Sequence, residues 1–187
     1  MKKMLMLAAG YCFLLACNNN KPAETNSAAT DTTAKTTEQK PPPQSEFADA
    51  KFTDIGKKNL QQLSSGDIDG WMNSFADNAK YRWSSGDSLE GKAAIATYWK
   101  ERRTKVIDSI TFINDIWLPI KINKPQKGPD SEGNWLLSWY MVNVKYKNGK
   151  KLMFWVHTDM HFDANDKIDQ FIQYIDRAPI NKALGMH

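Results

Sequence analysis

Cysteine is nearly absent from this sequence, with only Cys12 and Cys17 among 187 residues. Two cysteines near one end of the chain do not make a disulfide-rich scaffold, which typically depends on several bridges. The length indicates one domain with a possible terminal extension, and such a domain can bury a core that is stable without disulfides. The fold must therefore be predicted from the pattern of apolar, aromatic and polar residues.

The N-terminus joins a basic start to a short apolar run. Lys2 and Lys3 precede an apolar run over residues 4–16, which is too short to span a bilayer as a helix. A basic start followed by a short apolar run is typical of a secretion signal. We therefore expect residues 1–16 to be a signal peptide.

The end of the apolar run, Leu14-Leu15-Ala16-Cys17, resembles the bacterial lipobox, in which the cysteine is acylated and the preceding peptide removed. The resemblance implies lipid on Cys17 and stable attachment to a membrane, since two or more acyl chains anchor a protein firmly. The alternative is an ordinary signal peptide followed by a chance cysteine. Asn18 follows without an acidic run, and by resemblance to lipoprotein sorting patterns we expect the cell envelope, in the outer membrane and facing the periplasm.

The next segment is poor in residues that can form a core. Residues 18–46 contain six Thr, four Asn, four Ala and four Pro, and no aromatic or large aliphatic residue. Such a composition cannot offset the entropy lost on ordering, so we expect residues 17–46 to be the acylated cysteine and a flexible tether. The domain then occupies residues 47–187. It holds 20 Lys and Arg against 17 Asp and Glu, scattered along the sequence, and we expect no nucleic-acid partner.

Helical periodicity comes first in the domain and strand alternation follows it. The spacing of apolar residues predicts helices over residues 52–63, 68–75 and 91–103, with Asp67 as the N-cap of the second. Strands are predicted over residues 80–83, 109–122, 135–146, 151–162 and 167–176. Asn148-Gly149 predicts a type I′ turn, and Pro119 marks a sheet edge or a bulge. This order predicts an α+β fold with helices on one face of an antiparallel sheet.

Several segments resemble the nuclear transport factor 2-like (NTF2-like) superfamily. The matching stretches are residues 65–71 and 75–79, residues 89–95 with Tyr98 and Trp99, and the turn around Asp163 and Asp166. The resemblance implies a cone in which three helices from the N-terminal half pack on a strongly curved antiparallel sheet around a hydrophobic pocket. The superfamily includes ketosteroid isomerases, SnoaL-like cyclases and non-enzymatic binding domains, so function must be argued from the site.

Ketosteroid isomerase chemistry needs a carboxylate base and two acidic donors. By this resemblance the tyrosine donor falls at Asn59, the base at Trp83 and the carboxyl donor at Thr158. An indole cannot abstract a proton, and an amide and an aliphatic hydroxyl are far weaker acids than the groups they replace. We therefore expect no ketosteroid isomerase activity and no cofactor.

The same register predicts which side chains face the inside of the cone. The predicted pocket consists of Asn59, Trp83, Trp99, Phe154, Val156, Thr158, Met160, Phe171, Gln173 and Ile175. We expect it to bind a small apolar or amphipathic ligand, with Asn59, Thr158 and Gln173 orienting the polar end. Two alternatives stay open: the large side chains fill the core completely, or the domain is a SnoaL-like lyase, isomerase or hydrolase with a base that the sequence does not locate.

The opposite face of one strand carries His157, Asp159 and His161. The outer two are roughly 13 Å apart on a regular strand, so all three could share a metal ion only across a bulge. We expect no metal and keep these three residues as a weak alternative site. The face is expected to be solvated or to form a homodimer, in which Trp155, Ile172 and Tyr174 would be apolar neighbours.

Overall fold

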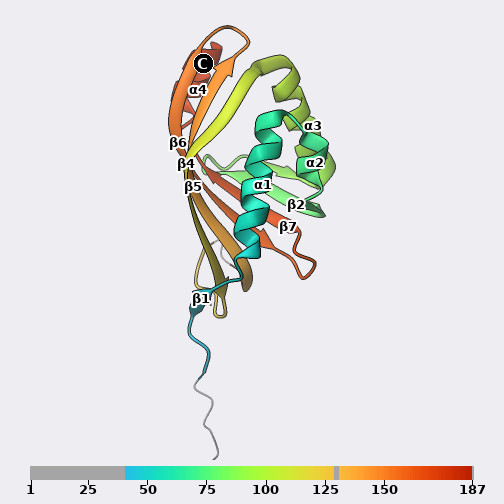
Figure 1. The fold of residues 1–187 in the computed structure, drawn as a ribbon, viewed down its shortest axis with the longest axis vertical. Helices are drawn as coiled ribbons and strands as arrows, with labels where there is room; N and C mark the ends of the chain where they lie inside the picture. The colour runs from blue at the N-terminus through green and yellow to red at the C-terminus, as the bar shows by residue number, and fades with distance from the viewer. Residues whose placement is uncertain (1–40, 129–130, 187) are drawn as a thin grey trace, which may run out of the picture. The chain divides into compact units, whose positions relative to one another are not determined.

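One seven-stranded sheet organises residues 41–128 and 131–186, the part of the chain that the computed structural model describes (Figure 1). The predicted signal peptide, the lipidation site Cys17 and the tether as far as residue 40 lie outside the described residues. The strand order is β1-β4-β5-β6-β7-β2-β3, and neighbouring strands are antiparallel except for the parallel pair of β2 and β7. The predicted α+β class is confirmed.

The elements follow one another as the periodicity predicts, with four additions. The strands are β1 (Ser45–Phe47), β2 (Phe75–Trp83), β3 (Ser88–Glu90), β4 (Ile107–Ile122), β5 (Gly133–Tyr146), β6 (Lys151–Phe162) and β7 (Ile168–Tyr174). The helices are α1 (Lys51–Ser65), α2 (Ile68–Met72), α3 (Lys92–Glu101), the π-helical turn η1 (Arg102–Val106) and α4 (Ala178–Leu184). Figure 1 shows α1, α2 and α3 on the inner side of the bent sheet. The sequence patterns did not predict β1, β3, η1 or α4.

Capping ends α1 and begins α2 as predicted. The backbone of Gly66 is left-handed, with φ of 83°, and its N–H bonds back to the last carbonyls of α1. The side chain of Asp67 accepts a 2.9 Å hydrogen bond from the backbone N–H of Gly70, which makes it the N-cap. The second helix is shorter than predicted, because Phe75 already belongs to β2 and packs its ring edge-on against Trp71.

Three local predictions need correction. A bulge lies at Asn114 and Asp115, where the β4–β5 register shifts and Asn114 has φ of 56°. Pro119 itself pairs regularly with Leu136 and lies beside the last β1–β4 pair, where its carbonyl accepts a hydrogen bond from the backbone N–H of Ala48, so it marks the place where β1 ends. Of the residues in the β5–β6 turn only Gly149 has a positive φ, whereas a type I′ turn needs two in succession. β1 begins at Ser45, inside the segment expected to be tether, because backbone pairing with β4 requires no apolar side chain.

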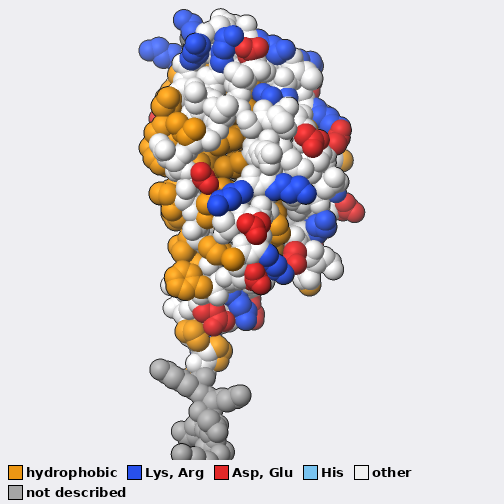
Figure 2. Space-filling view, viewed as in Figure 1, with side chains coloured by type: hydrophobic (Ala, Val, Ile, Leu, Met, Phe, Trp, Pro, Cys, Tyr) orange, Lys and Arg blue, Asp and Glu red, His pale blue; other side chains and the backbone are white. Residues whose placement is uncertain are grey.

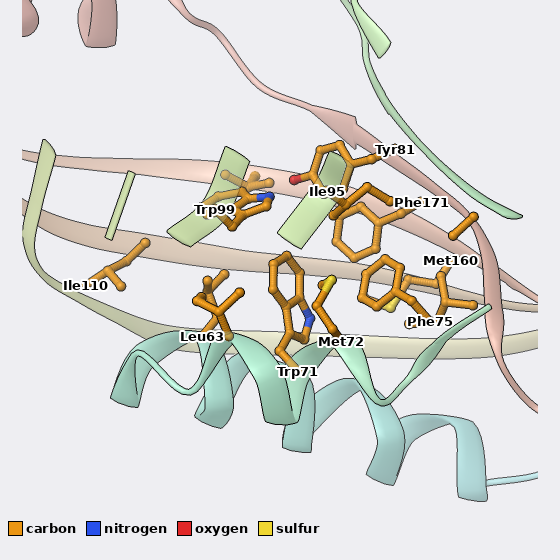
Figure 3. Close-up of a cluster of buried hydrophobic side chains, with 14 of the residues drawn as sticks. Leu63, Trp71, Met72, Phe75, Tyr81, Ile95, Trp99, Ile110, Met160 and Phe171 are labelled. Atoms are coloured by element: carbon orange, nitrogen blue, oxygen red, sulfur yellow. The ribbon is translucent and has the colours of Figure 1, made fainter. Parts of the chain in front are cut away.

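Aromatic rings form the centre of the core. The Trp71 ring makes edge-on contacts with Phe75, Trp99 and Phe171, at centroid distances of 5.2, 5.4 and 6.2 Å. Figure 3 shows Trp71 rising from the helical layer between Leu63 and Met72 toward Phe171. Edge-on contacts of this kind add about 0.5–1.5 kcal/mol each beyond the burial of apolar area. Trp71 of α2 therefore contacts α3 and two strands of the sheet, β2 and β7.

The close approach of α1 to the sheet depends on Gly56. A Cβ atom at this position would lie 2.5 Å from Cζ3 of Trp117 and 2.6 Å from Cδ2 of Leu136, far inside van der Waals contact. Gly56→Ala should therefore lower the free energy of unfolding by about 1–3 kcal/mol, although alanine favours a helix over glycine by about 1 kcal/mol. Urea denaturation measures the change.

Lys58→Ala is the matched control, because Lys58 is exposed on the same helix and should leave stability nearly unchanged. In a Trp117→Leu background the cost of Gly56→Ala should shrink, since the clashing ring is gone. An alanine that stabilises the wild-type background would contradict this account of α1.

Candidate functional site

A cavity of about 100 Å³ lies between the helices and the concave face of the sheet, and residues of α4 contribute to its lining. Nine of the ten residues predicted for the pocket line it: Asn59, Trp83, Trp99, Phe154, Val156, Met160, Phe171, Gln173 and Ile175. Its volume is below the roughly 150 Å³ of an engineered cavity that binds benzene. The large side chains thus fill part of the core and leave a space for a small group, which side-chain movement would enlarge.

Further lining residues were not predicted. Tyr81 lies two residues before the predicted pocket residue Trp83 on β2, so alternation along that strand was a signal for it. Tyr140 and Tyr146 come from β5, where the available signal was alternation, and Tyr140 stands opposite Val156 across the β5–β6 pair. Ile180 and Leu184 come from α4, which carries only a short, unmarked apolar pattern.

Thr158 is the predicted pocket residue that does not line the cavity. It is fully buried, and its hydroxyl lies 2.8 Å from the hydroxyl of Tyr140. Thr158 therefore lies behind the cavity wall, where its hydroxyl positions Tyr140.

Gln173 is the centre of a hydrogen-bonded network inside the cone. Its Oε1 accepts hydrogen bonds from the Tyr81 hydroxyl at 3.0 Å and from Nε1 of Trp83 at 3.1 Å. The side chain also bonds to Tyr140, which joins this group to Thr158. Gln173 and Thr158 already have protein partners, so the role of orienting a ligand falls on other groups.

Both buried phenols stay protonated at neutral pH. Burial raises the pKa of Tyr140 to about 12, although its hydrogen bonds to Thr158 and Gln173 act in the opposite direction. Burial also raises the pKa of Tyr81 well above its ordinary value, and the charge of Arg102 offsets only part of this. The network thus consists of neutral donors and acceptors.

Asn59 and Trp99 are the buried cavity residues with unsatisfied polar atoms. Asn59 is 2% exposed, and neither its Nδ2 nor its Oδ1 has a hydrogen-bond partner among the described protein groups. The same holds for Nε1 of Trp99. The centroids of the Tyr81 and Trp99 rings are 6.1 Å apart, and Figure 3 shows the Tyr81 hydroxyl turned toward the Trp99 indole. An unsatisfied buried polar group costs about 1–3 kcal/mol, so these atoms favour a bound polar group.

The cavity offers no carboxylate or imidazole. Among the described residues that line it, the charged ones are Arg102 and Arg177, and none is Asp, Glu or His. Asp159 and Asp169 lie on the outer face of the sheet, and Asp176 is exposed beyond the end of β7. Proton abstraction by a carboxylate or histidine therefore has no candidate group in this lining.

On the outer face His157 and Asp159 form a pair. The His157 ring stacks on Trp139 and Tyr174 at 4.4 and 5.2 Å, and its Nε2 lies 2.8 Å from Oδ1 of Asp159. Burial raises the pKa of Asp159, while His157 and Tyr174 act to lower it. Burial and the neighbouring carboxylate of Asp159 raise the pKa of Tyr174.

His161 belongs to a different group on the same face. It pairs with Asp169, and its Nε2 lies 3.1 Å from the backbone carbonyl of Glu132. His157, Asp159 and His161 therefore do not converge. In the described ranges no group of three or more His, Cys, Asp or Glu side chains is arranged to hold a metal ion.

Known structures share this fold, whereas no family model and no curated protein sequence matches the chain. An NTF2-like protein of unknown function from Burkholderia pseudomallei K96243 is 12% identical, with a TM-score of 0.56 over 71% of this chain and 95% of that one. An LEH-like epoxide hydrolase from M. tuberculosis is 17% identical, with a TM-score of 0.52 over 72% and 90%. A hypothetical protein with a ketosteroid isomerase-like fold from Catenulispora acidiphila DSM 44928, in complex with trimethylamine, is 11% identical to this chain. Its TM-score is 0.52 over 71% of this chain and 93% of that one. The chain has the NTF2-like fold, as its sequence resemblance predicts.

Proposed function

We propose that this chain is a lipid-anchored protein of the bacterial cell envelope whose NTF2-like domain binds a small apolar or amphipathic molecule in the cone. The observation that carries the proposal is Asn59, a buried amide with two unsatisfied polar atoms in a mostly apolar cavity. Leaving such a group unpaired destabilises the folded protein. A ligand with a hydroxyl or carbonyl group would supply the missing hydrogen bond. The rings of Trp99 and Phe171 would hold the apolar body.

An enzyme of the SnoaL-like kind is the less favoured alternative. General acid–base chemistry would need a group that changes protonation near neutral pH. The titratable groups of the described lining are tyrosines and arginines, and the pKa values of Tyr81 and Tyr140 move away from neutrality. Binding requires no such group and is the simpler function for this lining.

Benzyl alcohol tests the binding proposal with one ring and one hydroxyl. In the lipid-free mature chain carrying Cys17→Ser, benzyl alcohol should shift the NMR signals of the Trp83 and Trp99 indole N–H groups. Asn59→Leu should weaken this binding about five- to tenfold, as expected for one lost hydrogen bond, and should stabilise the ligand-free protein because it removes the unpaired amide.

Asn78→Leu is the control, since Asn78 is exposed on β2 and should not alter binding. Native mass spectrometry of protein purified from its bacterial host would show a co-purifying ligand directly. Indole signals that stay unchanged at millimolar benzyl alcohol would count against a ligand cavity.

Anchoring is proposed from the sequence, where Cys17 closes a short apolar run. In the part of the chain that the structure describes, no helix has the length and apolar character needed to cross a membrane. In a Gram-negative host fed an alkyne-tagged fatty acid, the full chain should be labelled, and Cys17→Ala should abolish the label. Cys12→Ala is the control and should keep it. Undiminished labelling of Cys17→Ala would contradict lipidation at this residue.

The outer face of the sheet is proposed to form a homodimer. Register aligns apolar side chains from four strands into one continuous outer patch: Ile113, Ile116, Leu118, Leu137, Trp139, Met141, Met153, Trp155, Ile172 and Tyr174. Trp155 is 50% and Met153 60% exposed, which is unusual for side chains of this size. Figure 2 shows hydrophobic side chains along the flank where β4, β5 and β6 lie.

A second copy fits this outer patch better than a charged partner does. The carboxylate within the patch belongs to Asp159, and His157 lies against it, so the surface offers little net charge to a partner. A two-fold axis would place the outer patch of one copy against the same patch of the other copy and bury both.

Trp155→Asp should convert a dimer to a monomer in sedimentation velocity, because a carboxylate would then be buried at the contact. Lys58→Asp places the same group on exposed α1 and should leave the dimer intact. If the wild-type lipid-free chain is monomeric at micromolar concentration, the dimer proposal fails.

A further inference from the structure

The lining of the cavity carries a guanidinium group without a carboxylate partner among the described residues. Arg102 lines the cavity as the first residue of η1, and its guanidinium lies 5.6 Å from the centre of the Tyr98 ring. In the ranges that the structure describes, no carboxylate lies within ion-pair distance of it. The second cationic lining residue, Arg177, differs because it is paired with Asp87. Arg102 is thus the uncompensated charge of the cavity.

The nearby acidic groups are already engaged by other cations. Glu101, the residue before Arg102, pairs with Lys105 at 2.7 Å. Asp108 pairs with Lys145 at 2.7 Å on the adjoining strands. Among the described residues, these two carboxylates beside η1 are therefore engaged by lysines and do not pair with Arg102.

Further basic side chains lie on three segments that hydrogen bonds join to one another, namely η1, the β5–β6 turn and α4. The backbone N–H of Lys147 donates to the carbonyl of Val106, which ties the β5–β6 turn to η1. The side chain of Asn148 donates to the carbonyl of Ala183, which ties the same turn to α4. The exposed basic residues of these segments are Lys147, Lys150, Lys151 and Lys182. Figure 2 shows Lys and Arg side chains gathered at the end of the sheet where these segments lie.

Two further N–H donors belong to residues that line the cavity. Trp99 lies three residues before Arg102 on the same helical stretch, so both side chains fall on one face. Nε1 of Trp99 and Nδ2 of Asn59 are unpartnered N–H donors in the cavity, and a carboxylate accepts hydrogen bonds from such groups. The walls beyond them are aromatic and aliphatic.

We infer that the cavity selects an organic anion with a compact apolar body, such as an aromatic or short aliphatic carboxylate. The apolar body lies among the aromatic walls and the carboxylate lies against Arg102. This inference rests on the proposed binding function and adds the charge of the ligand to it.

Benzoate and benzamide test the charge, because they share one ring and nearly one shape. Titrations by NMR or calorimetry at pH 7 should show benzoate binding about tenfold more tightly than benzamide, the size expected for one charge-assisted contact. Arg102→Gln should remove most of this difference by weakening benzoate about tenfold, while benzamide changes less than twofold. Arg102→Lys should keep part of the preference, because it retains the charge and loses the planar fork.

Lys58→Gln is the control, since it removes an exposed positive charge from α1 at a residue that does not line the cavity. It should change benzoate binding less than twofold, and circular dichroism should show every variant folded. Equal affinities for benzoate and benzamide, or an equal loss of both in Arg102→Gln, would overturn the anion inference and leave the proposed binding function standing. Failure of both probes to bind at millimolar concentration would overturn both.

Discussion

The contact between α1 and the concave face of the sheet determines how much space the cone can hold. Gly56 lets the helix backbone approach Trp117 and Leu136 so closely that no side chain fits between them. Further along the same helix, Asn59 and Leu63 face the interior, where the distance to the sheet is spanned by aromatic rings. The helix therefore closes the cone at one point and leaves room beyond it. The cavity therefore lies beside Asn59 and Leu63, next to the tightly packed contact at Gly56.

The polar groups of the interior divide into those that support the structure and those that remain available. Gln173 accepts from Tyr81 and Trp83, and Thr158 holds Tyr140, so these side chains stabilise the wall. Asn59 and Trp99 have no comparable partners. Unpaired buried amides are rare because they cost stability without return. Their presence in one apolar space favours a binding role over a purely structural one.

Periodicity predicted the α+β class, and the resemblance to the NTF2-like superfamily supplied the cone and most of the cavity wall. The register taken from that resemblance placed Phe154, Val156 and Gln173 on the inner face, and the period of two along β6 and β7 agrees with it. It could not show that Thr158 stands behind Tyr140, since that depends on a contact between strands. Short elements were missed for a related reason. β1 and β3 are held by backbone pairing at sheet edges, and α4 by contacts made after the sheet has formed.

The position of the charged side chains in space was the property that could be predicted least well from the sequence. Lys147, Lys150 and Lys182 are separated from Arg102 by long stretches of chain, so the basic residues look scattered when they are counted in order. Two hydrogen bonds, from Lys147 to Val106 and from Asn148 to Ala183, bring their segments to one end of the sheet. Exposed lysines there attract any anion from a distance, and salt screens that attraction over about 10 Å. Arg102 differs from them because it adjoins the apolar wall, where the interaction with a carboxylate is less screened. The exposed lysines would then act mainly on the rate of capture, and Arg102 on which molecule is retained.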